Sequence, residues 1–218
     1  MLLSGEIGSL NKKQRAYLQE LYGNNRRMIE LVNSLLNVSR LELGTFSVAP
    51  TPIYFRIIAD EALDEFASQI AFKELRIKKS YDSTLPLINA DKEFLRIVFQ
   101  NLISNAVKYT PRGGSIRIAI GKKDKNVLIL VADTGIGIPG PQQHKIFTKL
   151  FRGDNARSLD SEGSGLGLYT VKSIVEHSDG KIWFDSKEGQ GTTFSIELPL
   201  SGMSKKAGKK RKFADSLS

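Results

Sequence analysis

Two asparagines and a lysine fall within a narrow arc of one predicted helix. The segment 91–109 has helical periodicity, and at about 100° per residue it brings Asn101, Asn105 and Lys108 close together. Amide oxygens are hard neutral ligands that Mg²⁺ accepts, and a lysine ammonium supplies a point charge for phosphate oxygens. The pattern therefore indicates a metal and phosphate site, with an ordinary solvated helix face as the alternative.

Two glycine-bearing loops follow this helix. In the first, DTGIGIP at 133–139, the Asp133 carboxylate could accept a hydrogen bond from an exocyclic amine such as that of adenine. Gly135 and Gly137 would let the backbone approach a flat base, although an ordinary turn explains the same residues. The second loop, GSGLGL at 163–168, opens a predicted helix whose first N–H groups suit a phosphate. A dinucleotide fold is disfavoured, because this loop lies late in the chain and lacks the acidic partner on a following strand.

The elements that position these residues alternate between helix and strand from Pro52 onward. We expect helices at 55–73, 91–109 and 167–177, and strands at 77–81, 87–89, 115–120, 127–132, 181–186 and 192–199. The apolar face of the 91–109 helix should pack on the sheet through Leu95, Val98, Leu102 and Ala106. The long polar segment 139–162 is predicted to be a functional loop or lid.

A separate long helix is predicted to reach about Leu43, with a stop at Gly44 and a linker through Pro50 and Pro52. Its wide apolar stripe is formed by Leu18, Leu21, Met28, Val32 and Leu35, with Tyr22, Ile29 and Leu36 beside them. Such a stripe cannot be buried within one helix, so it must pack on another helix of this chain or of a partner. Residues 1–8 are interpreted as the last turns of an earlier helix.

Composition excludes several classes of protein. The 218 residues include no cysteine, which excludes disulfides and thiolate metal sites. No apolar run approaches the roughly 20 residues of a membrane span, and the start lacks a secretory signal pattern. Of the net charge of +9, five units come from the segment 201–218. That tail could contact nucleic acid or an anionic membrane, but a disordered, solvated end explains it as well. We expect a cytoplasmic domain without a specific nucleic-acid partner.

Taken in order, the motifs resemble the catalytic ATP-binding domain of bacterial sensor histidine kinases. That family belongs with gyrase, the 90-kilodalton heat-shock chaperones and the mismatch-repair ATPases. The N, G1, F and G2 boxes and the last glycine-threonine motif are matched by NLISNAVKYT at 101–110, DTGIGIP at 133–139, FTKLFR at 147–152, GSGLGL at 163–168 and GTTF at 191–194. Residues 28–43, which include SLLNVSRLE, resemble the second helix of the family's dimerisation domain.

The resemblance implies an α+β fold of the Bergerat type. This is a two-layer α/β sandwich with a mixed sheet and about three helices on one face, preceded by a long helix of a truncated helical hairpin. The implied domains are a partial dimerisation hairpin at 1–48, a catalytic ATP-binding domain at 49–200 and a basic tail at 201–218.

The resemblance also implies roles for individual residues. Asn105 would coordinate Mg²⁺ with help from Asn101, and Lys108 would reach the phosphates. Tyr109 would flank the adenine, and Asp133 would bind its amino group. The rest of the implied ATP-binding set is Gly135, Gly137, Ile138, Phe147, Arg152, Gly163, Ser164, Gly165, Leu166, Gly167, Leu168 and Thr193. Within it, Arg152 would approach the terminal phosphate from the lid, and Thr193 would reach the adenine side through its hydroxyl or a water.

The residues implied to act in catalysis are Asn101, Lys108 and Arg152. In the related ATPases a glutamate stands at the position of Asn101 and acts as the base for water. An amide cannot take that proton. The asparagine therefore favours transfer of the phosphoryl group to a protein side chain over hydrolysis.

The chain departs from the family in having no suitable acceptor histidine. His144 lies in the lid segment and His177 at the end of the last helix, and neither fits the helical setting of an acceptor. We expect truncation before Met1, with natural loss as the alternative. The expected partners are an acceptor-histidine helix of the same or a partner protomer, a response regulator and a second copy in the full-length protein, which could be membrane-anchored. A non-enzymatic nucleotide-binding regulator and an anti-sigma-type serine kinase are the competing functions.

Overall fold

The computed structural model describes residues 10–43, 48–159 and 163–204. The interpretation of residues 1–8, the helix stop at Gly44 and most of the basic tail lie outside these described residues. Within them, no helix is long and apolar enough to cross a lipid bilayer.

The main sheet has five strands in the order β2-β4-β5-β7-β6. These strands are β2 (Arg76–Tyr81), β4 (Ser115–Lys123), β5 (Asn126–Asp133), β6 (Lys181–Lys187) and β7 (Gly191–Pro199). The β2–β4 pair is parallel and the other three pairs are antiparallel, so the sheet is mixed as predicted. In the central pair Ile129 lies opposite Ile196, and both are fully buried.

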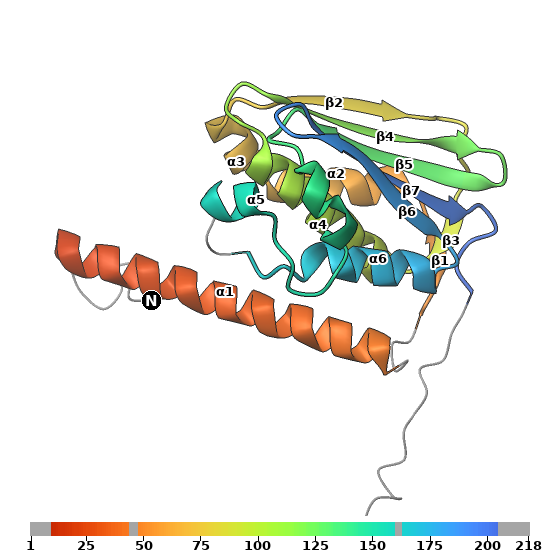
Figure 1. The fold of residues 1–218 in the computed structure, drawn as a ribbon. Helices are drawn as coiled ribbons and strands as arrows, with labels where there is room; N and C mark the ends of the chain where they lie inside the picture. Colours follow the sequence, from red (N-terminus) through yellow and green to blue (C-terminus); the bar gives the residue numbers. More distant parts are fainter. Residues whose placement is uncertain (1–9, 44–47, 160–162, 205–218) are drawn as a thin grey trace, which may run out of the picture.

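Helices α2 (Phe55–Glu65), α4 (Lys92–Tyr109) and α6 (Gly167–His177) cover one face of this sheet (Figure 1). The helix α4 lies in the middle of the layer and contacts both α2 and α6. Its predicted apolar face is buried, because Leu95, Val98, Leu102 and Ala106 are at most 2% exposed. The two-layer α+β architecture with three main helices on one face is therefore confirmed.

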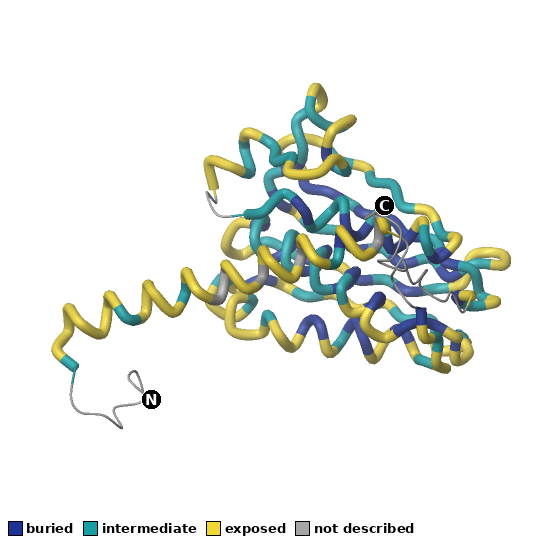
Figure 2. The backbone as a smooth tube through the Cα atoms, turned by 90° about the horizontal axis from the view of Figure 1, so that it is seen from below, coloured by how far each residue is buried: buried dark blue, intermediate teal, exposed yellow. Residues whose placement is uncertain are grey.

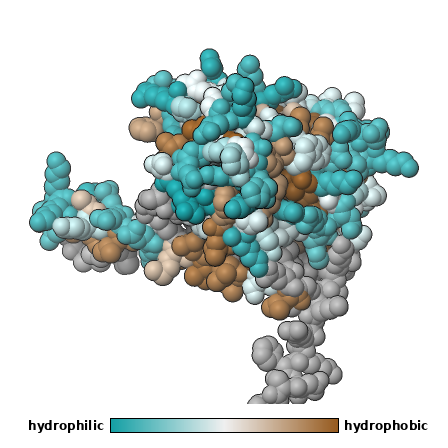
Figure 3. All heavy atoms as spheres, viewed as in Figure 1, coloured by the Kyte–Doolittle hydropathy of each residue, from teal (hydrophilic) through white to brown (hydrophobic). Residues whose placement is uncertain are grey.

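The long helix α1 (Lys12–Glu42) begins with a reciprocal capping arrangement between Asn11 and Gln14. It runs beneath the layer formed by α2, α4 and α6 and contacts α6 (Figure 1). Val38 is buried at 3% exposure, but much of the predicted stripe is open, with Leu21 and Met28 each 63% exposed. Figure 2 shows α1 largely exposed, and Figure 3 shows apolar residues gathered where it passes beneath the other layers.

The structure corrects two sequence predictions between 50 and 73. The predicted linker at Pro52 contains β1 (Thr51–Ile53), which pairs with β3 (Ile88–Ala90) in a small second sheet. An edge position tolerates a proline in a two-stranded sheet. The predicted helix 55–73 breaks at Phe66, where α2 ends, and α3 (Ala67–Phe72) follows. The break lets Phe66 and Ile70 pack against the core.

The predicted lid segment contains more regular structure than expected. The 3₁₀ helix η1 (Gly140–Lys145) and the helix α5 (Asp154–Leu159) lie within it. At the other end of the domain, packing continues past the boundary predicted at residue 200. Met203 is buried, and its N–H donates to the carbonyl of Asn89 at 2.7 Å.

Candidate functional site

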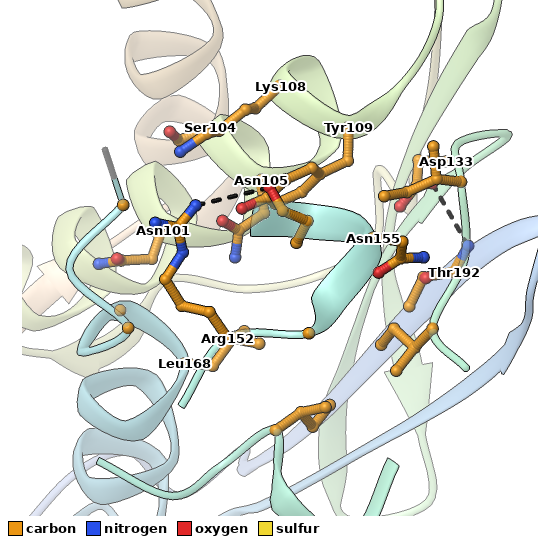
Figure 4. A pocket seen from close by; sticks show the side chains of 18 of the residues that line it. Asn101, Ser104, Asn105, Lys108, Tyr109, Asp133, Arg152, Asn155, Leu168 and Thr192 are labelled. Atoms are coloured by element: carbon orange, nitrogen blue, oxygen red, sulfur yellow. Dashed lines mark hydrogen bonds between the residues drawn. The ribbon is translucent and has the colours of Figure 1, made fainter. Parts of the chain in front are cut away.

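A cavity of about 730 Å³ opens beside the polar arc of α4. It is bounded by α4, the loop after β5, the lid and the start of α6 (Figure 4). The structure brings thirteen of the predicted site residues to its wall: Asn101, Asn105, Lys108, Tyr109, Asp133, Gly137, Ile138, Arg152, Gly163, Ser164, Gly165, Gly167 and Leu168. Residues as far apart in the sequence as Asn101 and Leu168 thus face one space, which makes this cavity the candidate site.

The amide of Asn101 is held by its own helix. Its Nδ2 donates to the carbonyl of Ile97 at 2.7 Å, which fixes the plane of the amide. The other end, Oδ1, lies against Gly167, so closely that a β-carbon at that position would collide with it. The glycine therefore leaves room for the Asn101 amide where α6 begins, and the Asn101 oxygen faces the helix N-terminus, where phosphates bind well.

At the opposite side of the cavity, Asp133 ends β5. Its Oδ1 accepts hydrogen bonds from the N–H of Gly135 at 2.8 Å and the N–H of Thr192 at 3.3 Å. Burial raises the pKa of Asp133 to about 6, although the two N–H donors oppose the shift. Because both described bonds use Oδ1, the second oxygen is the acceptor available to an amine in the cavity.

The loop after β5 is joined to the end of α4. The N–H of Ile136 donates to the carbonyl of Tyr109 at 3.2 Å. The next residue, Gly137, has a φ of +64°, and a β-carbon there would collide with the carbonyl of Lys187. Only a glycine fits this bend, so the loop is held between α4 and β6 and forms a fixed wall of the cavity.

The lid side of the cavity is held by side-chain amides. Asn155 in α5 donates to the carbonyl of Gly137 at 3.0 Å, and Gln143 donates to the carbonyls of Ile138 and Ser186, each at 3.0 Å. Arg152 extends from the lid toward the side of α4 that carries Asn101 and Asn105 (Figure 4). A cationic group thus reaches the cavity from the lid and faces the amides from the helix.

A family model described as the histidine kinase-, DNA gyrase B- and HSP90-like ATPase matches residues 90–202. The chain belongs to this ATPase family. Its relatives include the adaptive-response sensory kinase SasA of Rippkaea orientalis, 34% identical over 86% of this chain and 49% of that protein. The circadian input-output histidine kinase CikA of Synechococcus elongatus is 30% identical over 91% of this chain and 26% of that protein. The chain thus spans half or less of the length of these two relatives.

Among solved structures, full-length ShkA in complex with AMPPNP matches with a TM-score of 0.76 and 26% identity, over 92% of this chain and 42% of that one. Together with the kinase relatives, this likeness identifies the chain as the ATP-binding catalytic portion of a sensor histidine kinase.

Four residues of the ATP-binding set predicted for this histidine kinase portion lie outside the cavity wall. Gly135 donates its N–H to the Asp133 carboxylate, and Leu166 is buried at the start of α6. Phe147 packs edge-on against Phe184 and Phe194, with ring centroids 5.8 and 6.5 Å apart, and so anchors the lid to the sheet.

For the fourth residue, Thr193, the structure differs from the predicted position beside the cavity. Side chains alternate along a strand, and Thr192 and Phe194 face the cavity, which places Thr193 on the other face of β7. The alternation of the buried residues Phe194, Ile196 and Leu198 in the sequence could have identified Thr192.

Other wall residues of the kinase site were missed altogether. Lys73 follows α3, Asn155 lies in α5, and Leu31 comes from α1. These positions carry no motif, and only the tertiary packing of distant segments brings them to the cavity.

Proposed function

We propose that this chain binds Mg²⁺–ATP in the α4 cavity and donates the γ-phosphoryl group to a histidine on another helix. The observation that carries the proposal is the placement of Asn101, Asn105 and Lys108 opposite Asp133 across one cavity. Asp133 suits the adenine amino group, and the helix face suits the phosphates. Tyr109, at the end of that face, would flank the base.

The donor set fits magnesium only with the nucleotide present. The described residues contain no group of three or more histidine, cysteine or acidic side chains that could hold a metal by themselves. Mg²⁺ is commonly bound by one or two protein oxygens together with substrate phosphates, and Asn105 and Asn101 offer amide oxygens for this. When bound, the metal would neutralise charge on the phosphates during transfer.

Transfer breaks the bond between the γ-phosphorus and the oxygen of ADP and forms a bond from phosphorus to an imidazole nitrogen. This chemistry needs mainly positioning and charge neutralisation. Lys108 and Arg152 supply positive charge from opposite sides of the cavity. The amide of Asn101 cannot remove a proton from water, so this residue disfavours hydrolysis as a competing outcome.

The proposed partners follow from the same reaction. The apolar residues exposed on α1 favour a helical partner that presents the acceptor histidine. A response regulator would then take the phosphoryl group. A solved complex of the histidine kinase ThkA with the response regulator TrrA, 20% identical with a TM-score of 0.63, has the same fold in its kinase.

The test is transfer in trans. The chain is incubated with Mg²⁺ and γ-labelled ATP, together with a separate helical hairpin that bears an acceptor histidine in the family's sequence setting. We expect label on the hairpin that survives alkali and is lost in acid, as a phosphoramidate does. Omission of Mg²⁺, and a hairpin with the histidine replaced by glutamine, serve as controls. A chain that binds ATP but leaves the hairpin unlabelled would contradict the transfer step alone.

A further inference from the structure

The C-terminal end of α4 lacks the usual means of self-capping. Helices often satisfy their last carbonyls with N–H groups of a following glycine turn. Here Pro111 follows the capping residue Thr110, and a proline has no N–H to donate. Thr110 is extended, with φ −84° and ψ 127°, as expected before a proline. The N–H of Thr110 donates to the carbonyl of Ala106. The carbonyls of residues 107–110 need donors from other parts of the chain.

One lysine supplies most of those donors. The ammonium of Lys73 donates to three carbonyls at the end of α4, with 2.8 Å to Val107, 2.7 Å to Lys108 and 3.1 Å to Thr110. The remaining carbonyl, that of Tyr109, accepts from Ile136. All the carbonyls from residue 106 to residue 110 are therefore satisfied, and three of the five depend on a single side chain.

The lysine is itself held in place. It caps α3, and its carbonyl accepts a hydrogen bond from the N–H of Gly113 at 2.9 Å, so main chain and side chain join the same two segments. A cation at a helix C-terminus also interacts favourably with the helix dipole. Burial lowers the pKa of Lys73 from its ordinary value. The three carbonyl acceptors favour the charged form and oppose this shift.

The last turn of α4 is the part of the helix that the site uses. It carries Lys108 and Tyr109, and Asn105 precedes it by less than one turn. Tyr109 also joins this turn to the loop that follows Asp133, because its carbonyl accepts from the N–H of Ile136. A donor that fixes these carbonyls therefore fixes both the phosphate side and the adenine side of the cavity.

We propose that Lys73 is a positioning residue for nucleotide binding, which acts through the carbonyls of α4 and not through contact with the phosphates. The inference rests on the proposed nucleotide site. Residues that orient the ligands of a metal site through hydrogen bonds typically change affinity or activity about tenfold to a hundredfold when they are replaced, and we expect an effect of similar size for Lys73.

The test compares three variants of the whole chain with the wild type. Lys73→Met removes the ammonium and keeps the stem, and Lys73→Arg restores a cationic donor. Lys79→Met is the matched control, because Lys79 is an exposed lysine on β2 that bonds only the surface carboxylate of Asp60 among the described residues. Affinity for Mg²⁺–ATP and, in the same titration format, for adenosine is measured for each, with thermal unfolding as a check of folding.

The expected result is that Lys73→Met weakens the binding of ATP and of adenosine by the same factor, about tenfold or more. Lys73→Arg should recover most of that loss, and Lys79→Met should remain within about twofold of the wild type. A loss confined to ATP would mean direct contact with phosphate and would overturn the proposal, as would unchanged affinity for both ligands.

An equal loss in Lys79→Met would attribute the effect to net charge and would also overturn it. If Lys73→Met does not fold, Lys73→Gln replaces it, with the same equal weakening expected and wild-type affinity for both ligands as the contradicting result. A wild-type chain that fails to bind ATP would instead contradict the proposed function.

Discussion

The two ends of α4 are secured in different ways. At the N-terminal end, the Asp91 side chain caps the helix through Oδ1, which accepts from the N–H groups of Glu93 at 3.0 Å and Phe94 at 3.2 Å. Its Oδ2 accepts from the N–H of Ala49 at 2.8 Å, in the segment between α1 and β1. The N–H of Asp91 also contacts the sulfur of Met203. This end is tied to the segments that enter and leave the catalytic domain.

At the C-terminal end, by contrast, the helix is held by Lys73 and by the loop that follows Asp133, and it borders the cavity. The N-terminal end has a conventional aspartate cap, whereas the hydrogen-bond donors for the last carbonyls at the C-terminal end come from other segments of the chain. Together with the proposed function, the comparison leads us to propose that the N-terminal end contributes mainly to stability and the C-terminal end to ligand binding. Substitutions at the two ends should therefore separate these properties.

The largest effect is expected from Asn105→Ala at the C-terminal end. Loss of the proposed metal ligand should lower phosphoryl transfer by at least about a hundredfold, since a lost metal contact leaves phosphate charge uncompensated. Thermal stability should stay close to that of the wild type, because Asn105 is only partly buried. The control is Gln100→Ala. It removes an amide of the same helix that donates a hydrogen bond to Glu65 of α2. A similar loss in both variants would contradict the assigned role.

The next effect concerns Asp133→Asn. The pKa of Asp133 is raised from 3.8 to about 6, so the folded state binds its proton more tightly than the unfolded chain does. Its ionised form therefore costs stability above pH 6, and this cost disappears as the pH falls below about 4. The neutral amide should raise the free energy of unfolding at pH 7.5 by up to about 3 kcal/mol, with no gain at pH 4.

The same variant should lose about tenfold in ATP affinity, since the amide can present a donor where the adenine amine needs an acceptor. Urea denaturation at the two pH values and calorimetric titration check these expectations. Asp185→Asn, at an exposed aspartate of β6, is the control. A variant that is more stable and still binds ATP as tightly as the wild type would contradict the proposed role of Asp133 in binding adenine.

At the N-terminal end, Asp91→Ala should have the opposite profile. Loss of the cap should lower the free energy of unfolding by about 1–2 kcal/mol, while ATP affinity stays within about twofold. Asp91→Asn retains a capping oxygen but replaces the acceptor for Ala49, so it separates the cap from the tie to the α1 segment. A tenfold loss of ATP affinity in either variant would contradict the proposed difference between the two ends of α4.

The smallest effect is expected at the lid. Asn155→Ala removes the hydrogen bond to the carbonyl of Gly137 and should weaken ATP binding by about twofold to fivefold, the worth of one neutral hydrogen bond. Ser158→Ala, on the same short helix but bonded within it, should have no effect. Hydrogen exchange over 140–159 should slow when a non-hydrolysable ATP analogue is added. Exchange that is equally fast with and without the analogue would contradict an ordering lid.

Much of the fold follows from local sequence. The spacing of Leu95, Val98, Leu102 and Ala106 fixes which face of α4 is buried, and the polar arc follows from it. The break at Phe66 could not be predicted, because it depends on packing against the core rather than on a glycine or proline. Lys73 was missed for a similar reason. Its three acceptors are carbonyls 34 to 37 positions away, which no side-chain pattern reveals.

The central claim, that the cavity donates a phosphoryl group and does not hydrolyse ATP, is tested most directly by following the γ-phosphate. The chain, with Mg²⁺ and γ-labelled ATP, is assayed with and without the acceptor hairpin, and free phosphate and labelled hairpin are quantified together. The account predicts almost no free phosphate without the hairpin, and label on the hairpin when it is present. Release of phosphate at the same rate in both mixtures, with the hairpin unlabelled, would contradict it.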